Sequence, residues 1–169
     1  MKIVETERLN LREMDSAIDA EFIFELLNTP KFLKYIGDRG VRSIEQAREF
    51  IEDRYRQSYR EHGFGLYTVE LKRNNTAVGV CGFVKREHFE FPDVGFALLP
   101  DFEGKGYGYE SANATLQYGR DKLDFKKVLA ITTPDNDVSG RLLGKLGFKF
   151  DRIFTSSEGE DLKLYEKQL

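Results

Sequence analysis

Residues 93–118, DVGFALLPDFEGKGYGYESANATLQY, constrain the fold more than any other stretch because they change character twice. Val94–Leu99 is a short apolar run, which is typical of a buried strand, and Pro100 interrupts it. Glycine then occupies every second position of Glu103–Gly108, and apolar residues recur at helical spacing from Tyr109. The pattern predicts a strand, a glycine-rich turn and a helix in direct succession.

The glycine-rich turn is a candidate binding site for an anion, most often a phosphate. Glycines let successive backbone N–H groups face one concavity, and the helix that follows adds its unpaired first-turn N–H groups and its positive dipole end. Lys105 adds a mobile positive charge. The alternative is a turn that only reverses the chain.

Two familiar phosphate loops do not match this turn. A P-loop is excluded because Gly104-Lys105 is followed by Gly106 instead of Ser or Thr. A dinucleotide fingerprint is excluded because its third glycine is replaced by Tyr109 or Ser111.

Composition limits the classes of function. A chain of 169 residues that is 40% apolar and 33% charged is expected to form one globular domain, residues 1–169. Its 29 acidic and 26 basic side chains give a net charge of −3, which argues against nucleic-acid binding driven by charge. The N-terminal charges do not suit a signal peptide, and no apolar run approaches membrane-spanning length. A single cysteine, Cys81, excludes an internal disulfide and a cysteine-rich metal site, so we expect a cytoplasmic protein without a metal.

Hydrophobic periodicity and turn residues predict the remaining elements. Expected strands are 9–14, 66–72, 77–84, 94–99, 127–132, 148–153 and 162–165, and expected helices follow caps near residues 15, 43 and 136 and the turn at 104–108. The helix between 94–99 and 127–132 makes that connection a crossover, so these two strands should be parallel. The order predicts an α+β domain on one mixed, mostly antiparallel sheet with flanking helices.

Several motifs in this order resemble the GNAT N-acetyltransferase superfamily, in particular its RimJ/RimL-like branch. Glu103–Gly108 is similar to the family's Gln/Arg-x-x-Gly-x-Gly/Ala loop, except that an acid replaces Gln or Arg. Glu7–Arg12 is similar to the opening ERLxLR strand, and Asn136–Phe148 is similar to the NxxSxxxxxKLGF segment. The resemblance covers nearly the whole chain and implies a GNAT-like fold whose parallel central strands splay apart.

The resemblance implies that acetyl-CoA is a co-substrate bound between the splayed strands. Backbone groups of Leu98 and Leu99 would pair with the pantetheine arm and stabilise the charge that develops on the thioester oxygen. The pyrophosphate would lie on the turn, and the implied cofactor-binding residues there are Glu103, Gly104, Lys105, Gly106, Tyr107 and Gly108. Asn136 and Ser139 would add contacts. The amine would attack the thioester directly, so most of the rate gain would come from positioning two substrates.

Proton transfer is assigned to Asp93 and Ser139. The tyrosine that many family members use as an acid aligns with Leu143, so Ser139, one turn earlier, is the expected substitute. Its alternative role is a hydrogen bond to the backbone near the helix start. Asp93 would deprotonate the amine, and the alternatives are His88, or solvent with Asp93 as a solvated acid at a strand edge. Both Asp93 and Ser139 are expected at the carboxyl end of the sheet, on opposite sides of the thioester.

The resemblance implies that aromatic residues beside the splayed strands line the acceptor site. The candidates are Phe32, Tyr35, His88 and Phe89, with Phe91 nearby, and the alternative for the aromatic residues is a place in the core. The acceptor is expected to be a primary amine of a protein N-terminus or a small molecule, and the protein a monomer or homodimer. Cys81 is expected in the core, because direct transfer needs no acyl-enzyme.

Glu103 is expected to point away from the phosphates, toward solvent or a basic partner, because a carboxylate beside a polyanion is disfavoured. Two other functions stay open. One is a non-catalytic acyl-CoA-binding module, motivated by Glu103 and by the missing tyrosine. The other is a nucleotide-binding protein that uses the loop for a different phosphate ligand.

Overall fold

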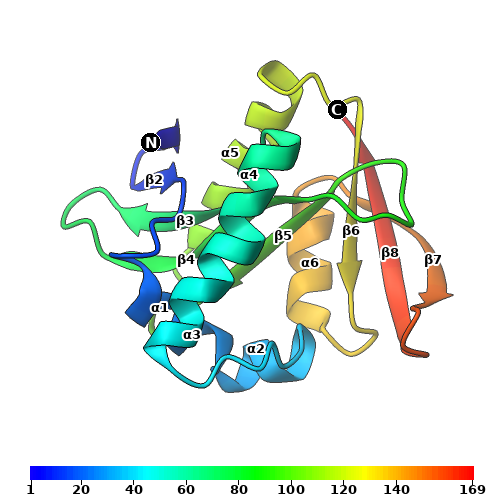
Figure 1. Ribbon diagram of the computed structural model, residues 1–169. Coiled ribbons are helices and arrows are strands. Elements are labelled where there is room, and N and C mark those ends of the chain that lie inside the picture. The colour runs from blue at the N-terminus through cyan, green and yellow to red at the C-terminus, as the bar shows by residue number, and fades with distance from the viewer.

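A computed structural model describes residues 1–169, which form an eight-stranded sheet in the order β1-β2-β3-β4-β5-β6-β8-β7 (Figure 1). The strands are β1 (Lys2–Glu5), β2 (Leu9–Arg12), β3 (Leu66–Leu71), β4 (Ala77–Val84), β5 (Asp93–Leu98), β6 (Lys127–Thr132), β7 (Lys149–Thr155) and β8 (Asp161–Gln168). Only β5 and β6 pair in parallel, and every other pair is antiparallel. The mixed sheet predicted from the sequence is confirmed.

Helices cover both faces of the sheet. They are α1 (Ala20–Leu27), α2 (Pro30–Tyr35), α3 (Ile44–Phe50), α4 (Gln57–His62), α5 (Tyr107–Asp121) and α6 (Asp137–Lys145), with a π-helical turn η1 (Ile51–Arg56) and a 3-10 turn η2 (Pro100–Phe102). α3 and α4 cross one face, while α5 and α6 lie behind the sheet (Figure 1). None of these helices is both long and apolar enough to span a membrane.

Burial on both faces explains the nearly continuous apolar sequence of β4. Cys81 and Phe83 belong to the core cluster that includes residues of α5 and α6. Val80 faces the other way and belongs to the cluster that includes residues of α1 and α3. A polar residue at any of these positions would be buried.

The residues of β2 alternate between a face that is buried in the core and a face that carries an ion pair. Leu9 and Leu11 are fully buried. Arg12 points to the opposite face, where its Nη1 and Nη2 donate to Asp19 at 2.8 and 2.9 Å and its Nε donates to Glu70 at 2.9 Å. Because Asp19 immediately precedes α1 and Glu70 lies on β3, Arg12 links β2 to both elements.

Most helix ends follow sequence signals, although α1 begins at Ala20 and not directly after the cap expected near residue 15. The Ser43 hydroxyl accepts a hydrogen bond from the Gln46 N–H at 3.1 Å and caps α3, and Thr29 caps α2 in the same way, with Pro30 as its first residue. The predicted second helix runs through η1 into α4 and continues past Tyr59 to His62, and Gly63 follows with a φ of +77°. α6 is followed by Gly147 at a φ of +92°.

The sequence did not predict β1 or the helical form of α2. β1 is an edge strand in which the half-buried Ile3 and Val4 are adjacent, so it lacks the alternation that identifies a half-buried strand. α2 is only six residues long, which is too short to display a helical period.

Candidate active site

The parallel strands β5 and β6 are joined at one end only. Asp93 and Leu129 form the single residue pair between them, and the Leu129 N–H donates to the Pro92 carbonyl at 2.9 Å. The other edge of β5 pairs with β4 along its whole length, and the other edge of β6 pairs with β8. Beyond Asp93 the facing edges of β5 and β6 therefore separate toward their carboxyl ends, as the resemblance to the family predicted.

Backbone alternation decides which amides of β5 face this opening. The Leu99 N–H donates to the Val78 carbonyl on β4 at 2.8 Å. Neighbouring residues of a strand direct their backbone groups to opposite edges, so the amides of Leu98 and Phe96 face β6. The prediction that the Leu99 amide pairs with the pantetheine arm is corrected, because this amide is bound to β4; the Phe96 amide faces the opening together with that of Leu98.

The turn after β5 has the geometry of an anion site. Gly104 and Gly106 have φ angles of +73° and +85°, which only glycine adopts without strain. A Cβ atom at Gly104 would meet no atom within 4 Å, so its surroundings are open. α5 begins at Tyr107 without a side-chain cap, which leaves its first N–H groups available. These features fit a phosphate group, with Lys105 exposed beside them.

Arg8, in the turn between β1 and β2, supports this loop. Its Nη1 donates to the Lys105 carbonyl at 3.0 Å, and its Nε donates to Glu110 on α5 at 2.7 Å. Its guanidinium lies 4.5 Å from the centre of the Tyr107 ring, which is buried. The Tyr107 ring is therefore packed under Arg8 at the start of α5. Arg8 lies within the recognised Glu7–Arg12 motif, but nothing in the sequence indicated that it would contact the loop.

Glu103 has a basic partner in Lys31 on α2. The Lys31 Nζ and Glu103 Oε2 atoms are 2.5 Å apart, and the side chains are 60% and 31% exposed. The sequence predicted that Glu103 would turn toward solvent or a base, without naming one. Lys31 lies 72 residues away in the chain, so no local pattern could have identified it.

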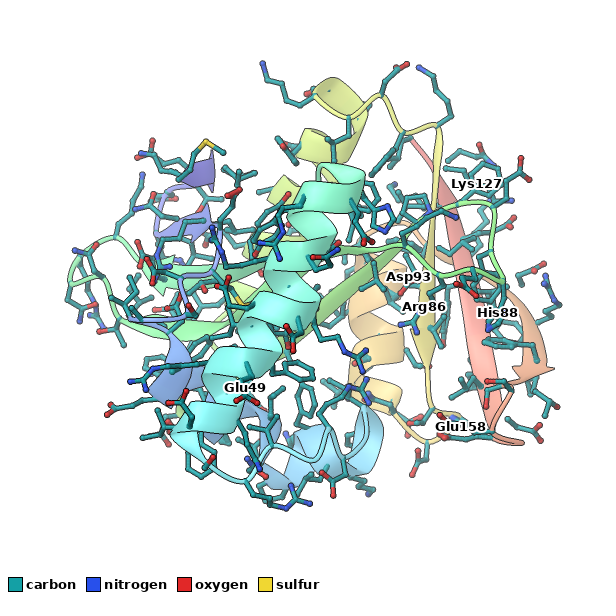
Figure 2. The ribbon with its side chains drawn as sticks, viewed as in Figure 1. Glu49, Arg86, His88, Asp93, Lys127 and Glu158 are labelled. Atoms are coloured by element: carbon teal, nitrogen blue, oxygen red, sulfur yellow. The ribbon has the colours of Figure 1, made fainter.

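Asp93 is buried where β5 meets β6, and only 3% of it is exposed. Arg86, in the β4–β5 loop, donates to it from Nε at 2.8 Å and from Nη2 at 3.4 Å. Figure 2 shows these two side chains together in front of β6, with His88 farther out toward β7. Burial raises the pKa of Asp93, and the charge and hydrogen bonds of Arg86 oppose that rise.

Two expectations for Asp93 are corrected by this placement. It is not a solvated acid at a strand edge, because Arg86 and the sheet enclose it. It also does not lie at the carboxyl end of the sheet, because it is the first residue of β5 and pairs with Leu129. Asp93 therefore lies at the closed end of the opening.

Asn136 and Ser139 lie at the open end, after β6. The Asn136 Oδ1 accepts the Ser139 N–H at 3.2 Å and caps α6. This bond uses the backbone of Ser139 and leaves its half-buried hydroxyl out of the cap. Leu143 is 1% exposed and belongs to the core. The Tyr165 hydroxyl of β8 packs against the first turn of α6, 3.2 Å from the place of a Cβ at Gly140.

Three of the candidate acceptor residues, Tyr35, His88 and Phe89, are at least partly exposed, and the fourth, Phe32, is buried. Tyr35 is half-buried with the Lys34 ammonium 4.8 Å from its ring centre, and His88 is exposed. Phe89 packs edge-to-face on Phe154 of β7 at 5.5 Å. The prediction that Phe32 lines the acceptor site is corrected, because it is 7% exposed and its ring anchors α2 in the core.

Phe91 lies under Lys127, whose Nζ is 5.2 Å from the ring centre. The β4–β5 loop therefore packs against the β6–β7 side of the opening through both Phe89 and Phe91.

Cys81 is a core thiol, as predicted. It is fully buried with its Sγ atom 3.3 Å from Thr115 Oγ1, and burial raises its pKa to about 11. No group of three or more His, Cys, Asp or Glu side chains is placed to hold a metal ion.

A hollow of about 620 Å³ lies along the outer side of α5 and is separate from the strand opening. Four acidic side chains line it, Glu5, Glu7, Glu110 and Asp121, against the two basic ones of Arg8 and Lys122, and this excess of negative charge makes it a poor site for phosphate.

The sequence matches the family described as "Acetyltransferase (GNAT) domain" over residues 8–149. The uncharacterized N-acetyltransferase YoaA of Bacillus subtilis is 30% identical over 153 residues, which are 89% of this chain and 85% of that one. The crystal structure of a GNAT-family acetyltransferase from Bacillus anthracis has a TM-score of 0.82 and 26% identity, covering 99% of this chain and 98% of that one. RimL, the ribosomal L7/L12 alpha-N-protein acetyltransferase in complex with coenzyme A, has a TM-score of 0.75 over 100% of this chain and 98% of its own. At 18% identity, RimL shows a likeness of fold alone.

The splayed strands, the glycine-rich start of α5 and these matches define an acetyltransferase fold. The chain belongs to the GNAT acetyltransferase family. It is an N-acetyltransferase that uses acetyl-CoA as co-substrate.

Proposed function

We propose that the protein transfers the acetyl group of acetyl-CoA directly to a primary amine in the opening between β5 and β6. One observation carries the proposal: the two strands separate after Asp93, and β5 leads into the uncapped, glycine-rich start of α5. Residues 1–169 are proposed to act as one N-acetyltransferase domain. The single buried cysteine suits a reducing compartment and supports a cytoplasmic location.

The chain offers separate groups for the two ends of the co-substrate. Gly104–Gly108 and the first turn of α5 bind the phosphates, with Lys105 adding charge. The amides of Phe96 and Leu98 pair with the pantetheine arm as an added strand would. A chain bound along β5 from the loop runs toward Asp93, so we assign the chemistry to the part of the opening between Ser139 at its open end and Asp93 at its closed end. Acetyl-CoA supplies an activated thioester there.

Asp93 is proposed to accept the proton of the amine, directly or through a water. Only a neutral amine is nucleophilic, and the raised pKa of Asp93 makes it a better base than an exposed aspartate. Arg86 holds the carboxylate in place through two hydrogen bonds. An α-amine with a pKa of about 8 needs far less help than a lysine amine with a pKa of about 10.4. We therefore favour an α-amine acceptor.

Ser139 is proposed to protonate the departing thiolate. Its hydroxyl is free of the α6 cap, which uses its backbone N–H. Asn136 fixes the first turn of α6 and so fixes the position of Ser139. Leu143, at the position where a tyrosine would act in many relatives, has no proton to give.

The acceptor is proposed to be a protein N-terminus or a small-molecule amine that reaches the site beside Tyr35, His88 and Phe89. The RimJ/RimL-like motifs of this chain, Glu7–Arg12 and Asn136–Phe148, favour the first class. A panel of amino-terminal peptides and small amines tests it. Thiol release from acetyl-CoA that depends on one class of amine identifies the acceptor.

Membership of the acetyltransferase family supports catalysis over the non-catalytic acyl-CoA-binding module that the sequence left open. The features that suit such a module are the ion pair that Asp93 forms with Arg86 and the apolar Leu143. The same assay separates the two functions. CoA binding without amine-dependent thiol release would identify a binding module.

A further inference from the structure

The loop that fits a phosphate is directly preceded by a carboxylate, Glu103. A negative charge beside a polyanion repels it unless the charge is cancelled. The structure places the Lys31 ammonium 2.5 Å from this carboxylate. Lys31 belongs to α2 and lies 72 residues from Glu103 in the chain.

α2 is fixed where it can hold this ion pair. Phe32, the neighbour of Lys31, is buried in the core, and the Thr29 hydroxyl accepts the Phe32 N–H at the start of the helix. The backbone of Lys31 is therefore anchored while its ammonium extends to Glu103. Figure 1 shows α2 at the end of the molecule toward which the arrow of β6 points, which is the open end of the splayed pair.

The next turn of α2 approaches the loop after β6. The pKa of Lys34 is raised first by the hydrogen bond and charge of Tyr35, and also by the charge of Asp135 in the β6–α6 loop. α2 therefore lies near the loops that follow both strands of the opening. A helix so placed can set the position of the Glu103 carboxylate relative to the co-substrate.

We propose that Lys31 is a positioning residue for acetyl-CoA, acting through Glu103. Lys31 cancels the charge of Glu103 and holds its carboxylate toward α2, so that the loop accepts the phosphates. This role rests on the proposed phosphate site at residues 104–108. It predicts that Lys31 matters only while Glu103 is an acid.

A double-mutant cycle tests the inference, with CoA binding measured by calorimetry on the full chain. Lys31→Gln should weaken CoA about three- to fivefold, which is the size expected for an exposed ion pair. Glu103→Gln should change the affinity little, and Lys31→Gln in the Glu103→Gln background should have no further effect. Lys34→Gln, which removes the same charge from the same helix, is the control and should bind CoA as the wild type does.

A phosphate-free acetyl donor adds a second readout. Lys31→Gln should raise the KM for acetyl-CoA and leave kcat unchanged, while its activity with acetyl-S-pantetheine should equal that of the wild type. A merely structural role for Lys31 would affect both donors equally.

Two results would overturn the inference. One is a Lys31→Gln protein that binds CoA as tightly as the wild type. The other is an equal loss in the Glu103→Gln background, which would make Lys31 a direct phosphate contact. Failure of the wild type itself to bind CoA would instead refute the proposed phosphate site.

Discussion

The Asp93 carboxylate and the Arg86 guanidinium form a two-pronged ion pair at the point where β5 and β6 meet, with distances of 2.8 and 3.4 Å. Asp93 is buried, while 44% of the Arg86 side chain is exposed. Arg86 therefore holds the Asp93 carboxylate at the closed end of the opening, while Arg86 itself is partly exposed to solvent. A carboxylate with this setting is suited to accept a proton from an incoming amine.

Replacing Asp93 with Asn should lower turnover by about 10²–10⁴-fold, the usual contribution of a general base. The loss should be greatest at low pH, where more of the amine is protonated. CoA binding should be unchanged, because Asp93 lies at the other end of β5 from the phosphate loop. Steady-state kinetics across pH, with calorimetry for CoA, would check this. Full activity of Asp93→Asn at every pH would remove Asp93 from the mechanism and leave His88 or solvent as the base.

The same substitution should change the pH dependence of stability. Burial raises the pKa of folded Asp93 above the value of about 3.9 in an unfolded chain. At a pH between these two pKa values, the folded state binds a proton that the unfolded state has lost. The free energy of unfolding of the wild type therefore falls as pH rises through that range. Asparagine does not titrate. The free energy of unfolding of Asp93→Asn relative to the wild type should therefore increase from pH 4 toward neutrality, as urea denaturation would show; a constant difference would contradict the shifted pKa.

Local signals were enough to predict most of the elements and the parallel pairing of β5 with β6, whereas the separation of these strands was expected only from the resemblance to the family. The apolar run of β4, the crossover through α5 and the caps at Ser43 and Asn136 all depend on residues close together in the sequence. The missed elements are β1, an edge strand with little burial, and α2, a helix of only six residues.

The contacts that complete the site could not be predicted in this way. Arg8 meets Glu110 across 102 residues, and Lys31 meets Glu103 across 72. Such ion pairs depend on where the folded elements place the ends of long side chains, and charge alone does not select one partner among 29 acids. The burial of Phe32 was missed for a related reason, because an aromatic residue near a site has the same sequence signature as one in the core.

Replacing Arg12 with Met should lower the free energy of unfolding by about 3 kcal/mol, the usual cost of breaking a buried ion pair. Asp19, 1% exposed, would lose its charged partner, and Glu70 would lose one hydrogen bond. Arg120→Met is the matched control, because its partner Asp121 is as exposed as Arg120 itself. Its stability should stay within about 0.5 kcal/mol of the wild type. Urea denaturation of both variants measures the difference, and equal effects would show that Arg12 stabilises nothing beyond a surface pair.

Replacing Ser139 with Ala should lower turnover with a weaker pH dependence than Asp93→Asn, because a serine hydroxyl does not titrate near neutral pH. Stability should be retained, since Asn136 still caps the backbone N–H at position 139. Asn136→Ala is the comparison, and loss of the cap should cost about 1 kcal/mol of unfolding free energy. Kinetics and thermal unfolding of both variants separate the two roles. Unchanged turnover in Ser139→Ala would mean that the thiolate takes its proton from water.

Replacing Gly106 with Asp tests the phosphate loop directly. Gly106 has a φ of +85°, and a side chain there would approach the Arg8 guanidinium at 3.2 Å while adding a negative charge to the proposed anion site. CoA affinity should fall by more than about tenfold through repulsion of like charges.

Gly159→Asp provides the matched control for this substitution. Gly159 has nearly the same backbone, with a φ of +81°, and lies in the β7–β8 turn, where an added Cβ would meet no atom within 4 Å. Both variants should lose about 1–2 kcal/mol of stability from the strained backbone. Only Gly106→Asp should lose CoA binding in calorimetry. If both variants bind CoA as the wild type does, the phosphates lie elsewhere, and the assignment of residues 104–108 is wrong.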